Sequence, residues 1–83
     1  MNPTDRDKEP CKVGVLSVVK HDYLPRAIAA HPRFELSFVA DEETRPDWTH
    51  ERNQLFANEF EIPYLRDVRQ TLEDYDLDAV AVS

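Results

Sequence analysis

Glycine and cysteine are almost absent from this sequence, which has one of each in 83 residues. The lone cysteine, Cys11, excludes an internal disulfide. With three scattered histidines it gives no ligand set at metal-site spacing. No apolar run is long enough to cross a bilayer, and residues 1–10 are polar rather than signal-like. These absences are typical of the reducing cytosol, so we expect a cytoplasmic protein with no membrane partner.

Basic residues are also scarce, because 10 lysines and arginines face 17 aspartates and glutamates, for a net charge of −7. A nucleic-acid partner calls for clustered positive charge on one surface. The composition therefore argues against nucleic-acid binding. Apolar residues make up 41% of the chain, which is enough for the core of one small domain.

The apolar residues predict strands and helices in alternation. Residues 1–11 are polar and contain two prolines, so we expect a disordered lead-in there. The predicted strands cover residues 12–19, 34–40, 62–65 and 78–83, and the predicted helices cover about 22–31, 46–60 and 67–75. This order indicates an α/β fold with a Rossmann-like parallel sheet, strand order 3-2-1-4 and helices on both faces. We therefore expect residues 12–83 to be the N-terminal part of a truncated Rossmann-type nucleotide-binding domain, because the outer edge of the last predicted strand is left uncovered.

Several local features follow from the same residue pattern. The candidate helix caps are Asp22, Thr44 and Asp67. In the second strand, simple alternation predicts one face made of Phe34, Leu36, Phe38 and Ala40. We expect Trp48 and the phenylalanines in the core, and His50 on an exposed helix face without a special partner.

The turn after the first strand stands where dinucleotide-binding proteins have a glycine-rich phosphate loop. Counting from Gly14, the fingerprint glycines would fall at Ser17, at Val19 or Lys20, and at Asp22. A side chain at the second position would crowd a pyrophosphate, and a carboxylate at the third would repel it. Charged side chains can meet the phosphates from the side instead. The candidate cofactor contacts here are Ser17, Val19, Lys20 and His21; the alternative is a turn that only connects strand to helix.

Asp41 ends the second predicted strand, 24 positions after Ser17. An acidic residue near this spacing hydrogen-bonds the adenosine ribose hydroxyls in dinucleotide folds. With Glu42 and Glu43 beside it, it predicts NAD rather than NADP, because a 2′-phosphate would meet carboxylates. The alternative is a solvated acidic loop. Ser83, at the end of the last strand, is expected on the rim of the cofactor side.

The neighbours His21 and Asp22 raise the question of a catalytic dyad or a metal site. Adjacent residues of an extended chain point in opposite directions, and no third ligand is near in sequence. Helix capping by Asp22 and phosphate proximity of His21 are the favoured interpretations. A phospho-acceptor receiver domain is excluded, since Arg66 rather than an acid follows the third strand.

Three segments occur in a familiar order and spacing: AAHPRFELSFVAD, IPYLRDVRQTLED and DLDAVAVS. They resemble the amino-terminal half of the Gfo/Idh/MocA oxidoreductases over about residues 12–83. The resemblance implies a Rossmann NAD(P) domain, a following substrate domain absent from this chain, sugar or polyol substrates and a homo-oligomer. The family's Glu-Lys-Pro motif, whose lysine acts near the reacting carbon, would come after residue 83. This chain would then have no catalytic residue of its own. It departs from the family in the turn, which reads LSVVKHD.

Two functions remain open from the sequence. The first is the NAD-binding portion of an oxidoreductase. The second is a non-catalytic Rossmann-like module that has lost its cofactor and serves in binding or assembly. The phosphate turn distinguishes them, because only the first requires it to contact a ligand.

Overall fold

Four parallel strands form one open sheet in the order β3-β2-β1-β4. The computed structural model describes residues 10–20 and 22–82. Its elements are β1 (Cys11–Leu16), α2 (Tyr23–Ala30), β2 (Phe34–Ala40), α3 (Asp47–Glu59), β3 (Tyr64–Leu65), α4 (Val68–Asp74) and β4 (Ala79–Val82). The predicted α/β class and strand order are confirmed.

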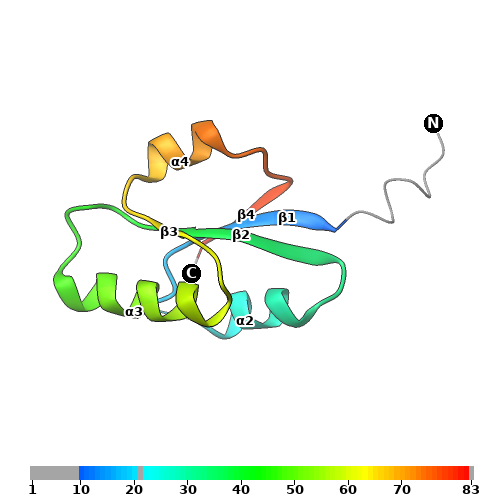
Figure 1. Ribbon diagram of the computed structural model, residues 1–83, viewed down its shortest axis with the longest axis horizontal. Coiled ribbons are helices and arrows are strands. Elements are labelled where there is room, and N and C mark those ends of the chain that lie inside the picture. The colour runs from blue at the N-terminus through cyan, green and yellow to red at the C-terminus, as the bar shows by residue number, and fades with distance from the viewer. Residues whose placement is uncertain (1–9, 21, 83) are drawn as a thin grey trace.

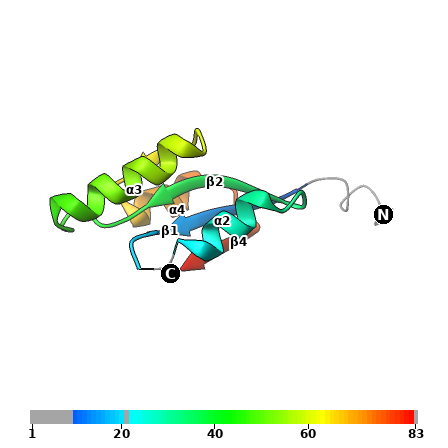
Figure 2. The ribbon, with the colours of Figure 1, turned by 90° about the horizontal axis from the view of Figure 1, so that it is seen from below.

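The helices cover both faces of the sheet, as predicted. Figure 1 shows α4 over one face and α2 and α3 over the other. In the view from below, α2 and α3 extend together across their shared face (Figure 2). The main core lies between this helix pair and the sheet, around the buried residues Val13, Val15, Val18, Leu36, Val39, Phe56 and Ala57.

β1 is shorter at its carboxyl end than the apolar run predicts, and it starts one residue earlier, at Cys11. The strand ends at Leu16 because Ser17 adopts a left-handed backbone, with φ of 67°. Val18 remains buried, although it now belongs to the turn rather than the strand. The prediction of a strand reaching residue 19 was therefore wrong, since apolar burial alone cannot separate a strand from a buried turn.

A one-residue register shift corrects the predicted faces of β2. Val13 pairs with Leu36, but the next residue, Gly14, pairs with Phe38, so Ser37 has no partner on β1. Leu36 consequently belongs to the α2/α3 core, whereas Phe38 packs against Tyr75, just after α4, with ring centroids 4.7 Å apart. Simple alternation had put Leu36 and Phe38 on one face. A bulge moves the following side chains to the opposite face.

Gly14 is required by close packing rather than by a phosphate turn. A Cβ atom at this position would overlap the ring of Phe38. Phe38 is itself fully buried, so the ring has no space into which to move. The sole glycine of the chain therefore leaves room for the Phe38 side chain of β2 to lie across β1.

Only one of the three expected helix caps forms. The Asp67 carboxylate accepts a hydrogen bond from the Gln70 backbone N–H at 2.9 Å. Asp22 precedes α2 but makes no cap; its carboxylate instead accepts a hydrogen bond from the side chain of Arg26. Thr44 is too early, because Pro46 occupies the N-cap position of α3. The i,i+4 ion pair thus replaces the cap that Asp22 was expected to supply.

Gly14→Ala should destabilise the fold by roughly 1–3 kcal/mol, because the new methyl group overpacks against a buried ring. Urea unfolding of the two proteins measures the difference. In a Phe38→Leu background the same alanine should cost much less. An equal cost in both backgrounds would show that the Phe38 ring is not the cause.

Candidate functional site

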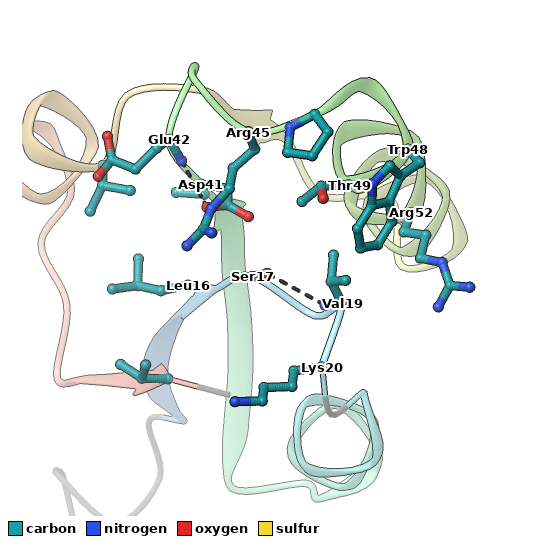
Figure 3. Close-up of a pocket in the computed structure, with 14 residues that line it drawn as sticks. Leu16, Ser17, Val19, Lys20, Asp41, Glu42, Arg45, Trp48, Thr49 and Arg52 are labelled. Atoms are coloured by element: carbon teal, nitrogen blue, oxygen red, sulfur yellow. Dashed lines mark hydrogen bonds and ion pairs between the residues drawn. The ribbon is translucent and has the colours of Figure 1, made fainter.

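The carboxyl ends of β1, β2 and β4 open onto one cavity of about 900 Å³. This is the edge of a parallel sheet where ligands usually bind. The cavity is shown in Figure 3, and its lining residues are Leu16, Ser17, Val19, Lys20, Ala40, Asp41, Glu42, Arg45, Pro46, Trp48, Thr49, Arg52, Val68 and Val82. It is the candidate site, because it combines an apolar floor with charged groups from three segments.

The turn at Ser17 keeps the shape of a glycine turn without a glycine. Its positive φ is a conformation that glycine adopts freely and that costs serine roughly 1 kcal/mol. The Ser17 N–H donates to the carbonyl oxygen of Ala40 at 2.9 Å, which ties the turn to the end of β2. The Ser17 hydroxyl accepts a hydrogen bond from the Val19 N–H at 3.4 Å and donates to the Asp41 carboxylate. Side-chain hydrogen bonds therefore offset the strain of this backbone.

Asp41 is buried, with its side chain only 5% exposed. Its Oδ1 accepts hydrogen bonds from the Glu42 N–H at 2.8 Å and from Arg45 Nε at 3.0 Å, and its Oδ2 accepts one from Asn53 at 3.0 Å. Burial raises the pKa of Asp41, but the hydrogen bonds from Glu42, Arg45, Asn53 and Ser17 outweigh it and lower the pKa below its usual value. The carboxylate is charged and already occupied by partners of this chain.

Asn53 connects the turn, Asp41 and β3 through one amide group. Its Oδ1 accepts the Val18 N–H at 2.9 Å, while Nδ2 donates to Asp41 and, at 3.2 Å, to the hydroxyl of Tyr64. The residue is completely buried. Every polar atom of its side chain is thus used, and α3 is fixed against the ends of three strands.

His50 extends this network and corrects a sequence prediction. It is buried rather than on an exposed face, with Nδ1 2.6 Å from the Tyr64 hydroxyl and Nε2 3.2 Å from the Glu43 carbonyl oxygen. The carbonyl oxygen of Glu43 only accepts, so Nε2 donates to it, and Nδ1 forms the hydrogen bond with the phenol. Burial raises the pKa of Tyr64, which keeps that phenol protonated. His50 is therefore a structural residue that joins α3 to Tyr64 on β3 and to the loop after β2.

Positive charge gathers at the cavity although the chain is acidic overall. Lys20, Arg45 and Arg52 line it together with two carboxylates, those of Asp41 and Glu42. Trp48 was expected in the core, but it is 55% exposed and forms a wall of the cavity. The guanidinium of Arg52 lies 5.9 Å from the Trp48 ring centroid. The cavity thus offers cations and one large aromatic surface.

The structure brings four of the predicted cofactor contacts together at this cavity: Ser17, Val19, Lys20 and Asp41. The other two, His21 and Ser83, lie outside the described residues. Sequence reasoning missed Arg45, Trp48, Thr49 and Arg52. For the three residues on α3 the available signal was their spacing, since positions 48, 49 and 52 are three and four residues apart, as neighbours on one side of a helix are. Arg45 lies in the loop before α3, where no such spacing applies.

No three histidine, cysteine, aspartate or glutamate side chains in the described part of the chain gather as metal ligands. Within the same residues, no helix has the length and apolar character needed to cross a membrane. Comparisons with known protein families, curated proteins and solved structures give no match for this chain. The resemblance to the oxidoreductase family therefore stays a prediction from the sequence.

Asn53→Ala should destabilise the protein by about 1–3 kcal/mol, because it leaves the buried Val18 N–H without its acceptor and removes a donor from Asp41. Chemical denaturation measures this cost. Asn58→Ala on the same helix is the control, since Asn58 is exposed and should change stability by less than ~0.5 kcal/mol. Equal effects of the two substitutions would contradict the role of Asn53.

The contribution of Asp41 to stability should depend on pH. Its folded-state pKa is depressed, so the stabilisation is complete above the unfolded value near ~3.9 and is lost as pH falls through the folded pKa. Asp41→Asn should therefore be less stable than the parent at pH 7, and the gap should narrow below about pH 4. Unfolding curves across this range provide the measurement. A gap independent of pH would show that ionisation of Asp41 is not involved.

Proposed function

We propose that this chain is the nucleotide-binding part of an NAD(P)-linked oxidoreductase of the Gfo/Idh/MocA type, acting on a sugar or polyol. The main support is the cavity at the carboxyl ends of β1, β2 and β4, where three cations gather in a chain of net charge −7. A dinucleotide carries two phosphates and an aromatic base. Lys20, Arg45 and the Trp48 ring offer matching charge and stacking surface.

The phosphates would be held by side chains rather than by backbone amides. In the turn, the N–H groups of Ser17, Val18 and Val19 all donate within the protein: to Ala40, to Asn53 and to the Ser17 hydroxyl. A glycine-rich loop keeps such groups for the pyrophosphate. Lys20, which is exposed and lines the cavity, takes over this role in the proposed complex.

The chemical step would use residues beyond position 83. The family resemblance places the reacting lysine there and the substrate on a further α/β domain. This chain then supplies cofactor binding alone, in a homo-oligomeric full-length protein. A cytoplasmic location is part of the same proposal, supported by the single cysteine.

A second candidate is a Rossmann-like binding or assembly module without a cofactor. One observation favours it: the Asp41 carboxylate, expected to bind ribose hydroxyls, already accepts hydrogen bonds from Glu42, Arg45 and Asn53. The same saturation weakens the reason for expecting NAD over NADP, since Asp41 is charge-paired with Arg45 and Glu43 lies near Arg66 at 3.6 Å.

Calorimetric titration with NAD and with NADP distinguishes the two candidates. Lys20→Ala should weaken dinucleotide binding by about 1.5–3 kcal/mol, the value of a charge-assisted hydrogen bond. Arg69→Ala is the control, because that side chain is almost fully exposed on α4 and does not line the cavity. If neither dinucleotide binds, the module without a cofactor is favoured.

A further inference from the structure

The outer face of α3 carries two large apolar side chains that stay mostly exposed. Trp48 is 55% exposed and Leu55 is 68% exposed. They are seven residues apart, which is about two helical turns, so both lie along the same side of the helix. In the view from below, no other described element lies in front of α3 (Figure 2). An exposed apolar stripe on a surface helix is suited to packing against another helix.

Opposite charges flank this stripe. Asp47 and Glu51 line a hollow of about 580 Å³ on one side of α3. Arg52 is on the other side, where it lines both the cavity at the strand ends and a hollow of about 380 Å³ between α2 and α3. Leu55 lines the 580 Å³ and the 380 Å³ hollows alike, so it forms a ridge between them. The face thus has an acidic flank, an apolar ridge and a basic flank.

The charges of the two flanks are not paired within the chain. Among the described residues, Asp47, Glu51 and Arg52 form no ion pair and no side-chain hydrogen bond. The neighbouring charges are different, since Arg26 of α2 is paired with Glu59 at the end of α3. The stripe is therefore bordered by one anionic and one cationic flank, each without a counter-charge of its own.

We propose that the outer face of α3 is a contact surface for a second copy of this chain, with the two α3 helices parallel and related by a two-fold axis. In a parallel pair, each flank of one helix meets the opposite flank of the other. Leu55 and Trp48 then meet their equivalents, and Glu51 of each copy meets Arg52 of the other. An antiparallel pair would place Glu51 beside Glu51 and Arg52 beside Arg52, which is repulsive.

The size of the surface limits the strength of this contact. A helix of 13 residues is about 20 Å long, so one helix from each copy buries less than a standard interface of about 1,600 Å². We therefore expect a weak dimer in equilibrium with the monomer. The contact needs no dinucleotide, so it stands or falls independently of the proposed function.

Sedimentation equilibrium at protein concentrations up to about 1 mM measures the dissociation constant of the dimer. Leu55→Ala should raise this constant by about tenfold or more, because each dimer loses two buried leucines. Leu72→Ala is the matched control, since Leu72 is an exposed leucine on α4, over the opposite face of the sheet (Figure 1), and should leave the constant unchanged. Circular dichroism of each variant verifies the fold.

Charge reversals test the orientation of the two helices. Arg52→Glu and Glu51→Arg should each raise the dissociation constant by at least about tenfold, because each places like charges on facing flanks. A mixture of the two variants should form a heterodimer about as tight as the parent dimer, since one copy is then acidic on both flanks and the other basic. Arg69→Glu makes the same charge change on α4 and should have no effect.

The net charge of the chain gives a built-in alternative. Glu51→Arg makes the chain less negative, so general repulsion between two acidic chains would predict tighter association of this variant. Weakening by both single reversals, with recovery in the mixture, would support the α3 contact. Tighter association of Glu51→Arg alone would overturn it, as would a monomer at every concentration. A dimer that survives Leu55→Ala and both reversals would also overturn it, because its contact would lie elsewhere.

Discussion

The buried amide of Asn53 is the contact on which the arrangement of this edge of the sheet depends. It accepts from the turn after β1 and donates to the end of β2 and to Tyr64 on β3. The first turns of α3 bury polar side chains, and hydrogen bonds satisfy these buried polar groups, so this part of the helix needs few apolar contacts. The same bonds shape the cavity and decide which polar groups remain available to a ligand.

Hydrophobic pattern was sufficient to predict the four strands, their order and the helices on both faces. It failed where the buried side chains are polar and where the register between two strands shifts. Thr49, His50 and Asn53 form the inner side of α3, whereas Trp48, expected inside, is exposed. Periodicity recognises buried apolar side chains only. The register shift at Ser37 carries no signature that alternation could detect.

The candidate site was predictable in position but not in chemistry. The end of the first strand and the acid ending the second strand marked the right edge of the sheet, because parallel strands bring their carboxyl ends together. The missing glycines also proved informative, since Ser17 keeps the left-handed turn and uses its hydroxyl inside the protein. The ion pair between Asp41 and Arg45 could not be predicted from the sequence, because it depends on the path of the loop before α3.

Hydrogen exchange at the Val18 amide tests most directly the claim that the turn's donors are used within the protein. We predict slow exchange in the ligand-free protein, because this N–H is buried and donates to Asn53. The Asn53→Ala protein should lose this protection while amides of β1 remain protected. Rapid exchange of this amide in the ligand-free protein, slowed only when a dinucleotide is added, would contradict this claim. It would indicate that backbone N–H groups of the turn bind the phosphates.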